Sequence, residues 1–185
     1  FARFGSQVFL IEAQHGLMPN DDRDAAAIVE QKMVRDGVKL LCCGKELKFS
    51  KIDTGKRLTV DSHGQYYDIT VDEILLGVGR TPNVQGLGLE TAGVQYDRNG
   101  VMVNERLQTT NPRIYAAGDI CSKYKFTHAA DAMAQIVIQN ALFPHPFGLA
   151  YASADSLVMP WCTYTEPEVA HVGMYEADAR AKGLE

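Results

Sequence analysis

Residues 109–119 read TTNPRIYAAGD, and this stretch decides the fold of the chain. The apolar run from Ile114 to Ala117 predicts a buried strand that leads into Gly118 and then Asp119. Glycine has no side chain, so the backbone at Gly118 can approach a bulky ligand closely. Asp119 offers acceptor oxygens and no donor, which suits the hydroxyl groups of a sugar or ribityl chain. The stretch predicts either a ligand-binding carboxylate at the carboxyl end of a strand or an Asp that caps the next helix.

Composition describes an ordinary globular protein. The chain has 185 residues, of which 46% are hydrophobic and 22% charged, enough for one domain with a good core or for two small ones. A formal net charge of -5 argues against nucleic acid or an anionic membrane as the main partner, because both attract a basic face. No apolar run approaches the roughly 18 residues that span a bilayer. We therefore expect a cytoplasmic protein.

Both ends of the chain resemble cuts within a longer protein. Residues 1–5 (FARFG) lack an initiator Met and a signal-peptide pattern, and they predict the last turn of a helix that ends at Gly5. Residues 176–185 predict a helix that precedes a further strand. We therefore expect an internal fragment.

The four cysteines show no redox or metal spacing. Cys42 and Cys43 are adjacent in an expected strand at 38–43, which would place their side chains on opposite faces, and Cys121 and Cys162 are isolated. No C-x-x-C or C-x-x-x-x-C pair occurs. The pattern favours buried, reduced thiols in a cytosolic protein, with no metal site.

The first part of the chain alternates between strand and helix patterns. Short apolar runs are typical of parallel strands covered on both faces, and the helical stretch between the first two places Ala25, Val29 and Met33 on one face. Period-two segments separated by turn residues then predict an antiparallel meander. The expected elements are a strand at 7–12, a helix at 21–36, a strand at 38–43, meander strands at 45–52, 57–61 and 66–70, and a strand at 73–78.

The second part is dominated by one apolar helix. Residues 128–143 are apolar nearly all round, which predicts a deeply buried helix. Residues 159–173 start a new segment in which two extended stretches flank a Thr-Glu-Pro-Glu turn, and His171 is expected within a strand. The residues expected on one face of the helix are Ala129, Met133, Ile136, Val137 and Asn140.

Two candidate dinucleotide contacts precede the Gly-Asp stretch. Glu12 ends the first expected strand, where a carboxylate can accept hydrogen bonds from ribose hydroxyls and repel a 2′-phosphate. No Arg follows until Arg23, so the sequence favours NADH over NADPH, although a solvated Glu is the simpler alternative. Gly79 lets the backbone approach a dinucleotide and Arg80 can contact phosphate. The alternative for this pair is a tight turn with a solvated Arg.

A third candidate is the start of the apolar helix at Thr127, His128 and Ala129. A helix N-terminus carries about half a positive charge, which favours an anionic group nearby. His128 is equally well explained as a helix-cap or core histidine.

Four motifs together carry a family resemblance. In chain order they are IEA at 11–13, GVGRTPN at 77–83, TTNPRIYAAGDI at 109–120 and PWCTYTEPEVAHVG at 160–173. Their order and spacing resemble the class I pyridine nucleotide–disulfide oxidoreductases, the family of dihydrolipoamide dehydrogenase, glutathione reductase and mercuric reductase. The resemblance covers essentially the whole chain, as an internal fragment of such a protein.

The resemblance implies an α/β fold in three parts. Residues 1–83 would be the C-terminal part of an NAD(P)-binding domain, a Rossmann-like parallel sheet with an antiparallel β-meander. Residues 84–148 would be the returning part of an FAD-binding domain. Residues 149–185 would begin an α+β dimerisation domain, and we assign no catalysis to them.

The resemblance also implies an enzyme. It would be an FAD-dependent oxidoreductase that passes electrons from NAD(P)H through flavin to a redox disulfide and then to a disulfide, lipoamide or metal ion. Asp119 would hold the ribityl chain of FAD, the helix end at 127–129 would face the flavin pyrimidine ring, and Glu12 would bind the ribose of NAD. The resemblance also implies that no catalytic residue lies in this chain, because the family's redox cysteines and its C-terminal His-Glu pair would come from segments outside it. The whole protein is expected to be a homodimer, and the fragment alone to be inactive.

Two alternatives remain open. A flavoprotein transhydrogenase or NADH oxidase has the same architecture without a redox disulfide. A non-catalytic nucleotide-binding or dimerisation module would contain no flavin at all.

Overall fold

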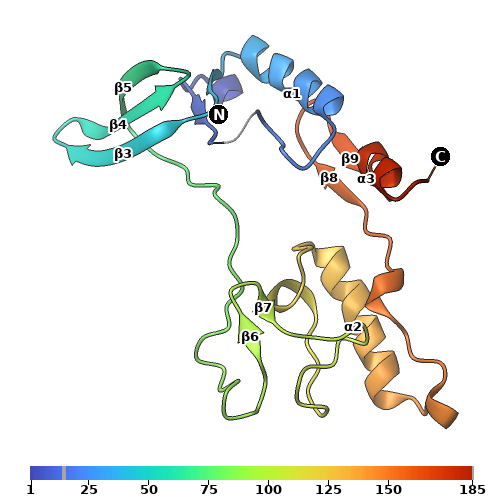
Figure 1. The fold of residues 1–185 in the computed structure, drawn as a ribbon. Helices are drawn as coiled ribbons and strands as arrows, with labels where there is room; N and C mark the ends of the chain where they lie inside the picture. Colours follow the sequence, from blue (N-terminus) through green and yellow to red (C-terminus); the bar gives the residue numbers. More distant parts are fainter. Residues whose placement is uncertain (14–15, 185) are drawn as a thin grey trace. The chain divides into compact units, whose positions relative to one another are not determined.

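The computed structural model describes residues 1–13 and 16–184, which form two compact units (Figure 1). The first unit comprises Phe1–Gly77 and Cys162–Glu185, and the second comprises Val78–Trp161. No helix in the described part of the chain is long and apolar enough to cross a membrane.

A parallel strand pair with a connecting helix begins the first unit. After the short 3-10 helix Ala2–Phe4, strand β1 (Phe9–Ile11) pairs in parallel with β2 (Lys39–Leu41). Helix α1 (Arg23–Arg35) connects them and buries Ala26 and Val29. The expected strand-helix-strand order is therefore confirmed.

An antiparallel meander follows (Figure 1). Its strands are β3 (Lys45–Ile52), β4 (Gly55–Ser62) and β5 (Gln65–Val71), with β4 in the centre. Alternate residues of a strand point to the same face, and Leu58 and Val60 accordingly bury their side chains against Leu41, Phe9 and Ile11. The parallel pair and the meander together confirm the expected α/β class.

Two strand regions expected in the first 78 residues differ in the structure. Residues 73–78 form no strand, and Leu75 and Val78 are 85% and 91% exposed, because no strand of the described chain pairs with them. Cys42 and Cys43 lie in a turn after β2 rather than on opposite faces of a strand. Cys43 has a positive φ of 57°, and the Gly44 N–H that follows the turn donates a 2.9 Å hydrogen bond to the carbonyl oxygen of Glu12.

The last segment of the chain packs within the first unit. Strands β8 (Trp161–Thr163) and β9 (Val169–His171) pair around a turn with a cis Glu166–Pro167 bond, so His171 lies in a strand as expected. Helix α3 (Glu176–Ala181) follows and is shorter than the expected 176–185, because residues 182–184 are not helical, and residue 185 lies outside the described chain. The Tyr175 hydroxyl donates a 2.9 Å hydrogen bond to Asp21.

Ion pairs around Asp36 connect three parts of this unit: the end of α1, the N-terminal 3-10 helix and the β8–β9 turn. Its carboxylate accepts hydrogen bonds from Lys32 at 2.8 Å and from Arg3 at 2.5 Å, and Arg3 also bonds Glu166 in the β8–β9 turn. The Lys32 bond, followed by the Arg3 bond, holds the pKa of Asp36 below its ordinary value. A lowered carboxyl pKa stabilises the fold above the unfolded pKa of about 4, and that stabilisation is lost as pH falls through the folded pKa.

We expect Asp36→Asn to lower the urea midpoint of the chain at pH 7, with the difference from wild type shrinking below about pH 4. Urea titrations at pH 7 and at a pH below about 4 measure this effect. Asp53→Asn, at an exposed position in the β3–β4 turn, is the matched control and should leave the midpoint unchanged at either pH. A difference that persists at low pH would show that Asp36 acts through packing and not through its charge.

The second unit is built around helix α2 (Thr127–Leu142). Before α2 come the short strands β6 (Tyr96–Asp97) and β7 (Gly100–Val101) and the 3-10 turn Gly118–Ile120. The core of the unit consists of Leu107, Met133 and Ile136, with partly buried side chains of 152–157 packed against them.

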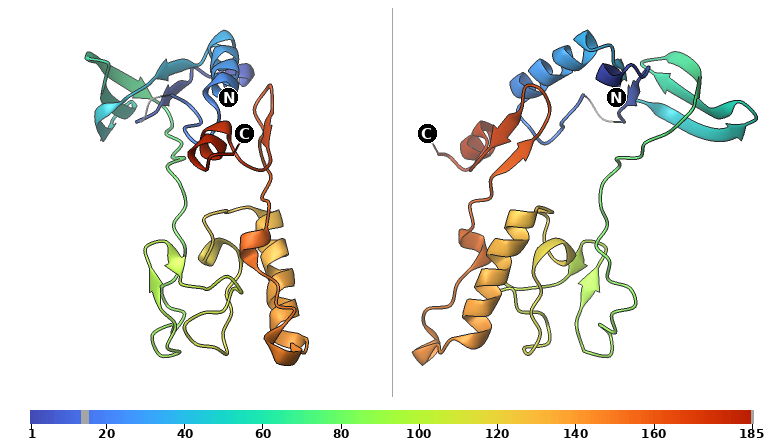
Figure 2. Two further views of the ribbon diagram at one scale, coloured as in Figure 1. Left: turned by 45° about the vertical axis from the view of Figure 1, so that its right-hand side comes forward. Right: turned by 180° about the vertical axis from the view of Figure 1, so that it is seen from behind.

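Residues 146–157 run back along α2, which Figure 2 shows from two further directions. They include the 3-10 helices Pro146–Gly148 and Ala154–Ser156. Buried Asn140 holds this return segment, because its amide donates to Ala152 O at 2.9 Å and accepts from Ala152 N at 2.9 Å.

Two expectations for the second unit are wrong in detail. Helix α2 buries Ala129, Met133, Ile136 and Asn140 but leaves Leu142 76% exposed, so one face of it is open in this chain. Residues 114–117 form no regular strand, because only one bridge, between Tyr115 and Gln108, is made there. Further backbone hydrogen bonds, such as the one from Ala116 N to Leu107 O at 3.0 Å, still hold residues 114–117 against neighbouring segments.

Candidate functional site

Two of the sequence motifs meet at one cleft in the second unit. The cleft has a volume of about 430 Å³. Arg80 of the GVGRTPN motif and Asp119 of the Gly-Asp motif both line it, although they are distant in sequence. The remaining lining residues are Thr81, Pro82, Asn83, Ile120 and Lys125.

Asp119 presents its carboxylate to this cleft. It lies in the 3-10 turn Gly118–Ile120, its side chain is 52% exposed, and its Oδ2 is 3.7 Å from Nη1 of Arg80. Helix α2 begins at Thr127 with Phe126 as its N-cap residue, so Asp119 does not cap that helix. The half-exposed carboxylate can therefore accept hydrogen bonds from a ligand.

Gly118 owes its identity to packing. It is buried with φ of 79°, and a Cβ at this position would lie 3.0 Å from Cβ of Ala130. Its N–H points to Sδ of Met133 at 3.4 Å. Helix α2 therefore packs against this side of the backbone, and the approach of a ligand to Gly118 stays a prediction.

Sequence reasoning missed two residues that shape the cleft. Lys125 donates from Nζ to the carbonyl oxygens of Asp119 at 2.8 Å and Ser122 at 3.0 Å, which closes the loop after the Gly-Asp turn. Gly100 has φ of 126°, and a Cβ there would lie 2.0 Å from Ile120 O. The local sequence predicts neither residue. The Lys125 contacts depend on the geometry of its loop, and the Gly100 contact depends on a segment distant along the chain.

The N-terminus of α2 lacks a side-chain cap. Phe126 has no acceptor for the N–H groups of the first turn, and these groups of any helix have no partner within the helix. Thr127 is exposed and Ala129 is buried. The exposed His128 forms a 2.7 Å hydrogen bond with the carbonyl oxygen of Pro160 and stacks on Phe126.

Glu12 lies in the first unit directly after β1. Its backbone N–H donates to Leu41 O at 3.1 Å and its carbonyl accepts from Gly44, so it is fixed beside the ends of both parallel strands. Arg23 donates from Nη2 to Leu17 O at 2.6 Å and Met18 O at 2.7 Å, so this guanidinium binds the loop before α1.

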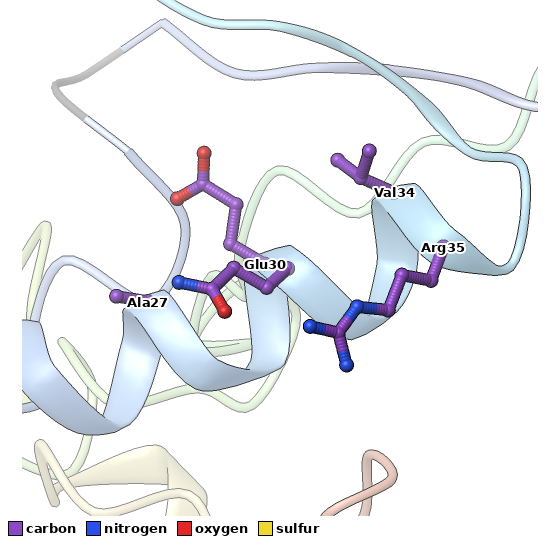
Figure 3. Close-up of a pocket in the computed structure, with 5 residues that line it drawn as sticks. Ala27, Glu30, Val34 and Arg35 are labelled. Atoms are coloured by element: carbon purple, nitrogen blue, oxygen red, sulfur yellow. The ribbon is translucent and has the colours of Figure 1, made fainter.

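Gly79 and a hollow on α1 offer fewer groups that could bind a ligand. Gly79 is exposed, and the space where its Cβ would stand is open. Figure 3 shows a hollow on α1 lined by residues of that helix alone, namely Ala27, Glu30, Gln31, Val34 and Arg35. Residues 1–13 and 16–184 contain no group of three His, Cys, Asp or Glu side chains placed to hold a metal ion.

Cys121 adjoins the cleft but is a weak nucleophile. Its Sγ donates to Gly118 O at 3.6 Å, and burial raises the pKa of the thiol to about 11. The thiolate is the reactive form. Cys121 therefore remains protonated at neutral pH.

We expect Cys121 to be alkylated roughly a hundredfold more slowly at pH 8 than an ordinary exposed thiol. Mass spectrometry after timed iodoacetamide labelling measures the rate at this position. The same cysteine in urea-unfolded chain is the control and should react at the ordinary rate. Equal rates in folded and unfolded chain would contradict the burial argument.

Comparison with known proteins places this geometry in a family. The model of the family described as pyridine nucleotide-disulphide oxidoreductase matches residues 1–135. A dihydrolipoyl dehydrogenase from Thermus scotoductus is 34% identical over 99% of this chain and 39% of its own length. A mercuric reductase from Staphylococcus aureus is 33% identical over 100% of this chain and 33% of its own length.

A solved structure shares the fold as well. The HOCl-induced flavoprotein disulfide reductase RclA from Escherichia coli matches with a TM-score of 0.83 and 29% identity, covering 100% of this chain and 41% of that protein. The chain thus spans between a third and about two fifths of the length of these relatives. The family match over residues 1–135, together with the motif order, shows that the chain belongs to the pyridine nucleotide-disulphide oxidoreductases.

Proposed function

We propose that the protein to which this chain belongs is an FAD-dependent NAD(P)H oxidoreductase of the disulfide type. The observation that carries the proposal is the half-exposed Asp119 carboxylate on the wall of the cleft that Arg80 also lines. The relatives named above are a dihydrolipoyl dehydrogenase, a mercuric reductase and a flavoprotein disulfide reductase. The final acceptor is accordingly proposed to be a disulfide, lipoamide or a metal ion.

The residues present fit a flavin. Asp119 would accept hydrogen bonds from ribityl hydroxyls, since a carboxylate provides acceptors only. The uncapped first turn of α2, at Thr127, His128 and Ala129, would direct N–H groups toward the pyrimidine ring, where donors favour negative charge. FAD, when bound, supplies the electron-transfer chemistry, and the protein supplies binding and orientation.

The redox cysteines are proposed to lie outside residues 1–185. No two cysteines of this chain have C-x-x-x-x-C spacing, and Cys121 is buried enough to raise its pKa. The proposed parts are an NAD(P)-binding region at 1–83, an FAD-binding region at 84–148 and the start of a dimerisation domain at 149–185. We also propose a cytoplasmic homodimer.

Glu12 is proposed to bind the ribose of NADH. A carboxylate at the end of the first strand accepts both ribose hydroxyls and repels a 2′-phosphate, and Arg23 binds the carbonyls of Leu17 and Met18. We expect Glu12→Ala in the parent protein to raise the KM for NADH by about tenfold, since hydrogen bonds to a charged group contribute about 1.5–3 kcal/mol each.

Steady-state kinetics with NADH and NADPH measures this effect. Glu46→Ala, at an exposed meander position, is the matched control and should leave both KM values unchanged. An unchanged KM for NADH in the Glu12 variant would contradict the ribose assignment.

Cofactor content tests the proposed function itself. The parent protein, purified and heat-denatured, should release one FAD per chain, identified by chromatography. The chain of residues 1–185, incubated with FAD and desalted, should remain colourless. A colourless parent protein would contradict the proposal and favour a nucleotide-binding module without catalysis.

A further inference from the structure

Arg80 contacts both ends of the loop that carries Asp119. Its Nη1 lies 3.7 Å from Asp119 Oδ2 and donates a 2.9 Å hydrogen bond to the carbonyl oxygen of Lys125. Lys125 in turn donates to the carbonyl oxygens of Asp119 and Ser122. Two cations therefore hold residues 119–125: Arg80, which lies outside this loop, and Lys125, which lies within it.

The backbone of the turn is fixed independently of Arg80. Cys121 and Ser122 N–H groups both donate to the Gly118 carbonyl, at 3.1 Å and 3.0 Å. The Ile120 carbonyl lies so close to Gly100 that no Cβ fits between them. Removing the Arg80 side chain would therefore leave the turn in place and release only the carboxylate and the far end of the loop.

The Arg80–Asp119 pair contributes little to stability. The two side chains are 69% and 52% exposed, and exposed ion pairs are weak because water and salt screen them. The pair instead orients the Asp119 carboxylate. One nitrogen, Nη1, approaches the carboxylate and donates to the Lys125 carbonyl. The planar guanidinium fixes the directions of the hydrogens on that nitrogen, which the rotating ammonium of lysine does less well.

We propose that Arg80 is a positioning residue that directs the Asp119 carboxylate into the cleft and holds the loop before α2. The inference rests on the proposed function, in which Asp119 binds the ribityl chain. It assigns Arg80 a role exerted through Asp119 and the Lys125 carbonyl, and not through contact with a dinucleotide.

A double-mutant cycle in the full-length parent protein tests this role. FAD affinity of the apoprotein is measured for wild type, Arg80→Ala, Asp119→Asn and the double variant, together with the thermal midpoint of each apoprotein. Arg80→Ala should weaken FAD binding by about tenfold, the factor that corresponds to about 1.4 kcal/mol, without moving the apoprotein midpoint. In the Asp119→Asn background the same change should have a clearly smaller effect, because only the contact of Arg80 with the Lys125 carbonyl remains to be lost and residues that act through each other are not additive.

Two further variants complete the design. Arg80→Lys keeps the charge near Asp119 and should recover part of the affinity. Arg98→Ala removes an exposed arginine of the same unit and should leave affinity unchanged. The visible circular dichroism of bound FAD should change in Arg80→Ala and return toward wild type in Arg80→Lys.

Equal weakening by Arg80→Ala in both backgrounds would overturn the inference, as would an unchanged FAD affinity in a wild-type protein that does bind FAD. A fall in the apoprotein midpoint accompanied by no rescue in Arg80→Lys would show a structural role instead and also overturn it. A wild-type protein without FAD would be a failure of the proposed function itself.

Discussion

Asp119→Asn should weaken FAD binding to the parent protein by at least about tenfold, since each hydrogen bond that a charged group accepts contributes about 1.5–3 kcal/mol. Asn has nearly the same shape, so the cleft is preserved. One of its two terminal atoms becomes a donor, however, and can no longer accept a hydrogen bond from a ribityl hydroxyl. Titration of apoprotein with FAD, followed by flavin fluorescence, measures the change.

The matched control for this variant is Asp155→Asn. Asp155 is an exposed carboxylate in the same unit, outside the cleft. It should bind FAD as wild type does, which separates loss of the Asp119 acceptor from loss of net charge. Equal affinity in wild type and Asp119→Asn would remove the ribityl assignment.

Gly100→Ala should destabilise the second unit by about 3 kcal/mol, combining about 1–2 kcal/mol for a side chain at positive φ with about 1–3 kcal/mol for overpacking. The added Cβ would stand 2.0 Å from Ile120 O. A backbone atom cannot rotate away as a side chain can, so the Gly118–Ile120 turn itself must move. Because that turn carries Asp119, the variant should also lose FAD affinity.

Gly93→Ala isolates the conformational part of this effect. Gly93 has φ of 67°, also positive, but the space where its Cβ would stand is open. Urea unfolding of both variants should therefore show a small loss for Gly93→Ala and a clearly larger one for Gly100→Ala. Equal losses would mean that the contact with Ile120 does not constrain the turn.

The sequence predicts best where local pattern and pairing agree. The meander β3–β5 was expected to within a few residues, because alternation along each strand and the turns between strands are local signals. Helix α2 begins within one residue of its expected start for the same reason, since its apolar spacing is read within the helix itself.

Apolar composition alone was a poorer guide to strands. Residues 73–78 and 114–117 are apolar runs of strand length, yet neither forms a regular strand in this chain. A parallel strand forms through backbone bonds to neighbours, and the sequence of the strand does not say whether those neighbours are present. Leu75, Leu76 and Val78 are exposed, as expected for an apolar run that pairs with no strand of the described chain.

In the candidate site, too, local motifs could be predicted from the sequence and contacts between separate segments could not. Asp119 and Arg80 were found from motifs, because an acid or an Arg after a glycine is visible in the sequence. Their mutual contact, the Lys125 bonds and the fit of Gly100 against Ile120 depend on how separate segments meet. Such contacts can be derived only from coordinates.

Anaerobic titration of the parent protein with NADH, followed by absorption spectroscopy, tests the central proposal most directly. A flavoprotein of the disulfide type should show oxidised-flavin bands that bleach on reduction, together with a long-wavelength band from charge transfer between a thiolate and the flavin. Bleaching without that band would contradict the disulfide chemistry and favour a transhydrogenase or NADH oxidase. A protein with no flavin absorption would contradict the enzyme proposal altogether.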